Sequence, residues 1–439
     1  MAITLIAILI AILVIILLTT KYAIHPFFAL FFACFIVGIG IGLPVSEILT
    51  VSKDGFGNIL KSLGFIIVFG TTLGVLLEHT GSTHVMATFL LRKVGERRAP
   101  FAMSLTGFVV GLPIFCDSGY IVLSGLNNAL SRRTGYSAVV MAVSMATGLY
   151  AVHCLIPPHP GATAAAAIIG IDYGRLILLG TIVAIPAMLV GYAWAVFAGS
   201  KENSVVRADP ERPQAISYPP PVIKAFLPIA IPIILIATRS FFTIDPNAGP
   251  TWLTKLLLLG DPVIALLIGI LLALNAKATW RSAEIGKLLN EAVEKAGSIL
   301  IIIGAGGAFG AVLIAAKLGD HLNAISGLSD FGLIAVFLIT ALLKTAQGSS
   351  TVAIITAASI VQPLLPALGI VSETEKLFSV LSMGAGSMMI SHANDAYFWV
   401  IAKFADIPVK SMLKVYSVAT VLMALTSLLV IQVFYLLLR

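Results

Sequence analysis

Four short polar segments interrupt long apolar stretches of this sequence, and they carry the side chains that could do chemistry. FCDSG (115–119) and HCLIPPHPG (153–161) lie in the first half, and KTAQGSST (344–351) and SHAND (391–395) lie in the second. Ionisable and hydrogen-bonding groups are costly in apolar surroundings, so their presence there favours a functional role. We therefore expect a functional site where the four segments meet.

Lys344 and Asp117 are the most isolated charges in these segments. Asp117 is the only carboxylate between Glu96 and Asp172, which suits a group that takes up a proton on one side of a membrane and releases it on the other. We expect Lys344 to act electrostatically near an anionic substrate, directly or through an ion pair. Two plainer interpretations stay open. Lys344 could snorkel toward an interface, and Asp117 could be its permanent partner or a cap.

Histidines accompany the second and fourth segments. We predict that His153, His392 and Asp395 join Asp117 in proton coupling, because histidine titrates near neutrality and can relay protons. His392 could equally belong to a hydrogen-bond network that holds the SHAND backbone, and His159, between two prolines, could be structural. The spacing of these residues does not predict a metal site.

Hydroxyl and amide groups in the same segments suit a polyol acid. Helix N-termini beside them could also bind a carboxylate through free N–H groups, although the hydroxyls could instead satisfy backbone groups freed by the breaks. The predicted substrate-binding residues are Ser118, Gly119, His159, Lys344, Gln347, Gly348, Ser349, Ser350, Thr351, Ser391 and Asn394.

The composition identifies an integral membrane protein. Apolar residues make up 59% of the 439 residues and charged residues 11%, against about 25% charged residues in soluble domains. The net charge of +7 does not predict nucleic-acid binding, because Lys and Arg of polytopic proteins collect in cytoplasmic loops. The three cysteines lie in apolar surroundings without metal or disulfide spacing. The apolar run 2–18 predicts a first span rather than a cleaved signal peptide.

The chain divides into two similar halves at a polar, proline-rich segment. We predict a first repeat over 1–198, a cytoplasmic linker over 199–221 and a second repeat over 222–439. Basic residues flank one broken apolar stretch in the first half, which predicts a re-entrant helical hairpin over about 101–131, followed by a broken helix over about 137–171. The second half has the same order, with a hairpin over about 331–369 and a broken helix over about 377–404.

Each half holds an odd number of crossings, so the two copies should have opposite orientations. Inverted repeats with broken helices are typical of secondary transporters, whose site lies at the repeat interface. The fold class is therefore an all-α polytopic membrane protein with two inverted-topology repeats, and both termini should face outside. Within the repeats we expect an amphipathic connection over 44–60, spans over 63–77 and 297–316, and close helix packing at GAGGAFG (304–310).

At the breaks the chain resembles the gluconate permease family, which comprises bacterial proton-coupled symporters for gluconate and related acids. The matching pieces are IPPHPGAT (156–163), GSSTVAIITAA (348–358), SHANDAYFW (391–399) and GDPVIALLIGILLA (260–273). The resemblance covers nearly the whole length. It implies the ion-transporter superfamily fold, with inverted repeats, two hairpins, broken helices and often a dimer.

The sequence departs from the family pattern at two places. Many members carry an aromatic residue and a carboxylate followed by a small apolar residue, whereas this chain has FCDSGY (115–120), with Asp117 followed by Ser118. Lys344 stands where relatives often have an arginine. Both changes alter pocket size and polarity, so a shorter hydroxy acid such as glycerate is a candidate substrate beside gluconate.

We therefore predict a proton-coupled symporter for gluconate, a related sugar acid or a short hydroxycarboxylate. We expect it in the cell inner membrane, and we do not expect it to be an enzyme. The alternatives are a sodium-coupled carboxylate or D-amino acid symporter, a channel, and an intramembrane enzyme using Ser/His chemistry. No GxSxG or HExxH supports the enzyme, and no GxxxxGK[ST] loop supports direct ATP drive. No cofactor is expected, and the predicted partners are the substrate acid, a proton or sodium ion, the lipid bilayer and a second copy of the chain.

Overall fold

All regular secondary structure of the described residues is helical in this computed structural model. The described residues are 2–202, 219–242, 256–277, 279–316 and 332–438. Most of the predicted linker, 203–218, lies outside them. The helices of the first half are α1 Ala2–Thr20, α2 Pro26–Gly40, α3 Val45–His79, α4 Ser82–Val94, α5 Ala99–Gly111, α6 Cys116–Thr134, α7 Ala138–Leu155, α8 Pro160–Ile169 and α9 Tyr173–Gly199.

The second half continues with helices of similarly varied length. A π-helical turn, Leu413–Ser417, joins its last two helices. The helices are α10 Val222–Phe241, α12 Pro262–Leu274, α13 Ser282–Ala315, α15 Gly332–Gln347, α16 Ser350–Val361, α17 Glu373–Gly386, α18 Ala396–Phe404, α19 Val409–Met412 and α20 Val418–Leu438.

The molecule has the surface of a membrane protein. Within the described residues, six segments are long and apolar enough to cross a membrane, by length and composition. Large apolar side chains such as Phe65 of α3 and Leu429 of α20 lie exposed, which suits contact with lipid. The predicted class of all-α polytopic membrane protein is confirmed.

The helices are interrupted at the four polar segments. α5 and α6 are separated at 112–115, α7 and α8 at 156–159, and α15 and α16 at Gly348 and Ser349. The longest interruption, 387–395, separates α17 from α18. Each half thus contains two helix–break–helix pairs in the predicted order. The inverted relation between the halves stays a prediction.

Local chemistry explains where the helices stop. Pro157, Pro158 and Pro160 lack the N–H that a helix interior needs, and the Pro157–Pro158 peptide is cis. Gly348 has a φ of +82°, which favours glycine. A Cβ added there would also collide with the backbone carbonyl of Asn394. The break after α15 therefore requires glycine both for its conformation and for its contact with SHAND.

α3 and α13 are both longer than hydropathy indicates. The expected connection 44–60 and the span 63–77 form one helix, because buried Ile48, Ser52, Ile59 and Leu63 recur at helical spacing. Likewise α13 begins at Ser282, well before the expected span at 297. Polar residues lower the hydropathy of these extensions without interrupting their helical periodicity.

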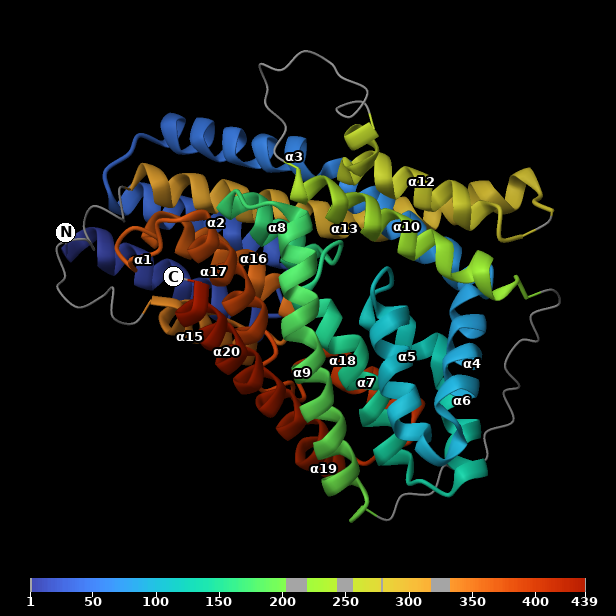
Figure 1. The fold of residues 1–439 in the computed structure, drawn as a ribbon. Coiled ribbons are helices and arrows are strands. Elements are labelled where there is room, and N and C mark those ends of the chain that lie inside the picture. Colours follow the sequence, from blue (N-terminus) through green and yellow to red (C-terminus); the bar gives the residue numbers. More distant parts are fainter. Residues whose placement is uncertain (1, 203–218, 243–255, 278, 317–331, 439) are drawn as a thin grey trace.

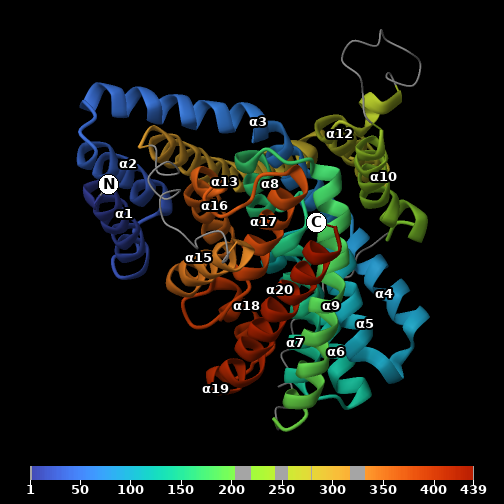
Figure 2. The same cartoon turned by 60° about the vertical axis from the view of Figure 1, so that its left-hand side comes forward.

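The two long helices run antiparallel along one edge of the molecule, as Figure 1 and Figure 2 show. A Cβ added at Gly307 would lie 2.6 Å from Ile59 Cγ2 and 2.7 Å from the Gly55 carbonyl oxygen. At the other end of the pair, His79 Nε2 lies 2.7 Å from Glu284 Oε1. The glycines of GAGGAFG therefore let the two backbones approach closely, as predicted.

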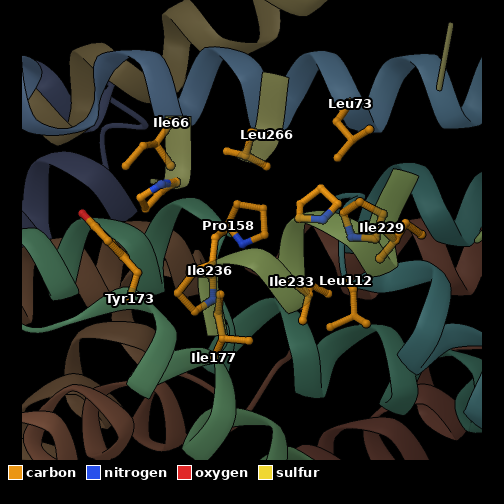
Figure 3. A pocket seen from close by; sticks show the side chains of 14 residues that line it. Ile66, Leu73, Leu112, Pro158, Tyr173, Ile177, Ile229, Ile233, Ile236 and Leu266 are labelled. Carbon is orange, nitrogen blue, oxygen red and sulfur yellow. The ribbon is translucent and has the colours of Figure 1, made fainter. Parts of the chain in front are cut away.

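The breaks of the first half also contact these long helices. Figure 3 shows Pro158 beside side chains of α3, α9 and α10 around an apolar cavity of about 30 Å³. A space of that size is too small for a sugar acid. The apolar face of this break is therefore a packing surface, and its labelled neighbours are Ile66, Leu73, Leu112, Tyr173, Ile177, Ile229, Ile233, Ile236 and Leu266.

We predict that Gly307→Val destabilises the protein by about 1–3 kcal/mol, the usual range for overpacking a tight contact. Gly286→Val is the matched control, because it lies on the same helix and an added Cβ meets nothing within 4 Å. Thermal unfolding in detergent should show a lower midpoint for Gly307→Val than for Gly286→Val. Equal midpoints would contradict the proposed packing.

Candidate functional site

A polar cavity of about 450 Å³ lies where the four segments meet. Residues from all four segments line it, together with Tyr150 of α7 and one face of α13. Pockets of about 300–1,000 Å³ are typical of small-molecule sites. The cavity is therefore large enough to hold a small organic ligand.

Four helices begin at this cavity. The first residues of α6, α8, α16 and α18 are Cys116, Pro160, Ser350 and Ala396, and each of them lines it. A helix N-terminus exposes unpaired N–H groups and the positive end of the helix dipole. Four such ends around one space favour a negatively charged ligand.

The four helix starts differ in how their N–H groups are used. The Ser349 hydroxyl accepts from Val352 N (3.3 Å) and caps α16. The Asp395 carboxylate accepts from Tyr397 N (3.0 Å) and caps α18. No described side chain caps α6 or α8. The start of α6 therefore offers backbone donors to a ligand.

Lys344 is completely buried, and its charge is neutralised inside the protein. Its Nζ lies 2.6 Å from Asp395 Oδ2. The same ammonium donates to the Gly348 carbonyl, and the Ser391 hydroxyl donates to Asp395 Oδ2. This network joins the break after α15 to the break before α18. Lys344 therefore does not line the cavity itself, whereas its partner Asp395 does.

SHAND also satisfies the C-terminal end of α15. Asn394 Nδ2 donates to the Thr345 carbonyl (2.9 Å) and the Ala346 carbonyl (3.1 Å). His392 Nε2 lies 3.1 Å from the same Thr345 oxygen. The last carbonyls of a helix have no partner within it, so these side chains stabilise the broken end of α15.

Asp117 faces the cavity from the first turn of α6. Among the described residues, no basic side chain lies within ion-pair distance of its carboxylate, because Lys344 pairs with Asp395 instead. Asp117 and Lys344 are nevertheless close enough to interact electrostatically. The two hairpin tips are thus at one site, and the permanent Asp117–Lys344 pair considered from the sequence does not form.

The two histidines of the second segment have different surroundings. His153 lines the cavity, and within the described structure its buried Nδ1 has no hydrogen-bond partner. His159 lies behind it, with ring centroids 5.0 Å apart, and its Nε2 is 2.7 Å from the Gly111 carbonyl. His159 therefore ties the start of α8 to the end of α5.

Gln347 presents a buried amide at the cavity. Neither its oxygen nor its nitrogen has a hydrogen-bond partner among the described residues, although an unpaired buried amide is costly. Nearby, the Tyr150 hydroxyl lies 2.7 Å from Ser350 Oγ and donates to the Ser387 carbonyl (3.1 Å). A polar ligand would supply the missing partners of Gln347.

The structure brings most of the predicted site residues to the cavity surface. Those that line it are Asp117, Ser118, His153, Gln347, Gly348, Ser349, Ser350, Thr351, Asn394 and Asp395. The remaining predicted residues lie outside the lining and support it from behind or beside: Gly119, His159, Lys344, Ser391 and His392. The roles assigned to both groups stay predictions.

Sequence reasoning missed several lining residues. Tyr150 and Tyr397 lie close to the second and fourth segments, and their aromatic type in apolar surroundings gave no signal of a site. Lys295 and Ser298 belong to α13. Lys295 follows Glu291 by four residues, which is the spacing of an ordinary surface pair. Only the packing of α13 against the breaks brings them to the cavity.

Broken helices that meet at a polar cavity inside an apolar, helical protein are typical of membrane transporters. The model of the GntP family of permeases matches residues 3–437. The chain therefore belongs to the GntP permease family, which confirms the resemblance seen in its motifs. It is a transporter and not an enzyme.

Relatives agree with this assignment, and a solved structure has a similar fold. The chain is 32% identical over 424 residues to a gluconate permease of Pseudomonas aeruginosa, covering 93% of this chain and 92% of the relative. It is 30% identical to the Gnt-II system L-idonate transporter of Escherichia coli, covering 93% of each. The YdaH transporter of Alcanivorax borkumensis has a similar fold, with a TM-score of 0.65, 18% identity and 90% coverage of both chains.

The buried pair makes a stability prediction. Lys344→Met leaves the Asp395 carboxylate without its cation, and Asp395→Asn leaves the Lys344 ammonium without its anion. Each substitution should therefore lower the free energy of unfolding by about 3–5 kcal/mol. The double variant should lose less stability than the two single variants together, because no unpaired charge remains in it. Thermal unfolding of the two single variants and the double variant measures this coupling.

Lys376→Met is the control for this cycle. Lys376 pairs with Glu373 on the surface of α17 at 2.9 Å, and such pairs contribute about 0–1 kcal/mol. Its unfolding midpoint should stay close to that of the wild type. Additive losses in the Lys344/Asp395 cycle would show that the two residues do not act as a pair.

Proposed function

We propose that the protein takes up gluconate, a related sugar acid or a short hydroxycarboxylate across the inner membrane, driven by protons. The observation that carries this proposal is the meeting of four helix N-termini at one cavity. Their dipoles favour a single carboxylate. The relatives described as gluconate and L-idonate transporters support the same substrate class.

The lining chemistry suits the hydroxylated part of such an acid. Ser118, Ser349 and Thr351 offer hydroxyl groups, and Gln347 offers an amide with both functions free. Hydroxyl and amide groups can donate to or accept from each hydroxyl of a polyol. Tyr150 adds an aromatic face to this wall. We infer that these residues select hydroxy acids over plain fatty acids of equal charge.

Asp117 is our proposed proton carrier. It is a carboxylate at the cavity with no basic partner among the described residues, whereas Asp395 is held by Lys344 and Ser391. A carboxylate without a cation can change its protonation state as the site opens to either side. His153 also lines the cavity and is a second candidate, and sodium coupling remains the alternative.

We retain the predicted architecture as part of this proposal. Residues 1–198 and 222–439 form inverted repeats, both termini face outside, and the protein is a homodimer. In each half the two helix–break–helix pairs contribute helix starts to the cavity, which is what a site at a repeat interface requires. Alternating access then exposes the cavity first to one side and then to the other.

Uptake by purified protein in liposomes tests the function. With an inward proton gradient, we expect saturable accumulation of labelled gluconate above its external concentration. Unlabelled gluconate, glycerate, lactate and D-serine then compete, and the acid with the lowest inhibition constant identifies the substrate. Inhibition by D-serine alone would favour the amino acid alternative, and passive equilibration would favour a channel.

Asp117→Asn tests the coupling. The amide is isosteric but cannot carry a proton, so proton-driven accumulation should fall to the level of empty liposomes. Exchange of internal for external substrate should continue, because exchange requires no net proton movement. Accumulation equal to that of the wild type would remove Asp117 as the carrier.

A further inference from the structure

Lys295 reaches the cavity from α13, a helix outside the four breaks. It lies on the same helical face as Ser298, Ile299 and Ile302, which also line the cavity. Their spacing of three, four and seven residues is that of one helix stripe. Lys295 is therefore part of a continuous wall that faces the starts of α6 and α16.

The basic groups near the cavity differ in their availability. Lys344 is fully buried and is neutralised by Asp395. Lys295 is the only Lys or Arg among the described residues that line the cavity, and 36% of its side-chain surface is exposed. Among the described lining residues, Lys295 thus carries the one full positive charge that a ligand can reach.

The present partners of Lys295 hold it loosely. Its Nζ lies 2.7 Å from Glu291 Oε1, and 43% of the Glu291 side chain is exposed. Glu78 of α3 lies beside the same lysine at a small space next to the cavity, close enough to interact electrostatically. Half-exposed pairs at i, i+4 spacing are weak, so another carboxylate can replace Glu291.

We propose that Lys295 contacts the carboxylate of the transported acid, and that Glu291 competes with the substrate for this lysine. The inference rests on the proposed function and names the residue that binds the anionic group of the substrate. Helix N-termini orient the acid from the side of the breaks, and Lys295 supplies a charge-assisted hydrogen bond from α13. A purely structural surface pair would leave substrate affinity unchanged.

Lys295→Met tests this role in the liposome assay with labelled gluconate. We expect the KM to rise about tenfold or more, as for loss of a charge-assisted contact, while uptake at saturating gluconate changes much less. Lys287→Met is the matched control, because Lys287 is an exposed lysine of the same helix and does not line the cavity. Its KM should equal that of the wild type.

Two further variants keep the test decisive if Lys295→Met folds poorly. Lys295→Arg keeps the charge and should show a KM between those of the wild type and Lys295→Met. Glu291→Gln removes the competitor and should lower the KM. Equal KM values for the Lys295 variants and Lys287→Met, with no decrease for Glu291→Gln, would overturn the inference.

The wild type separates this inference from the proposed function. If wild-type liposomes accumulate gluconate or another sugar acid and the Lys295 variants bind it normally, only the role of Lys295 is wrong. If the wild type accumulates no hydroxy acid of the panel, the proposed function fails and the role of Lys295 fails with it.

Discussion

The structure depends on satisfying backbone polar groups where helices break inside an apolar protein. Each break leaves carbonyls at one helix end and N–H groups at the next without partners, and lipid supplies none. SHAND meets part of this need, because Asn394 and His392 reach the last carbonyls of α15. Lys344 donates to the Gly348 carbonyl between α15 and α16. These polar residues at the breaks therefore stabilise the fold, independently of any part in binding.

This constraint explains why the two carboxylates at the cavity, Asp395 and Asp117, differ in their partners. Asp395 caps α18, accepts from Ser391 and neutralises Lys344, so little of its charge is left for a ligand. Asp117, in the first turn of α6, has no basic partner among the described residues. The N–H groups of α6 are also not used by a side-chain cap. The groups that hold the backbone and the unpaired carboxylate of Asp117 thus belong to different elements.

The sequence predicted the breaks well because their causes are local. Proline runs and a left-handed glycine such as Gly348 end helices, and hydroxyl residues favour helix starts. Three of the four segments also carry the family motifs. It did not predict which charges would pair, because the Lys344–Asp395 contact joins residues far apart in the chain. Lys295 was missed for the same reason. Its sequence neighbours indicate a surface pair, and only the packing of α13 places it at the cavity.

The two halves satisfy the same constraint by different means, and this difference sets the polarity of the site. The break before α8 uses prolines, which remove donors and pack against apolar side chains of α3 and α10 (Figure 3), with His159 as its tie to Gly111. The breaks of the second half use an ion pair and amide groups. A break held by apolar packing leaves a nearby carboxylate such as Asp117 without a fixed partner. In a break held by charges, the charged groups pair with one another. The first half therefore keeps a carboxylate without an ion-pair partner among the described residues.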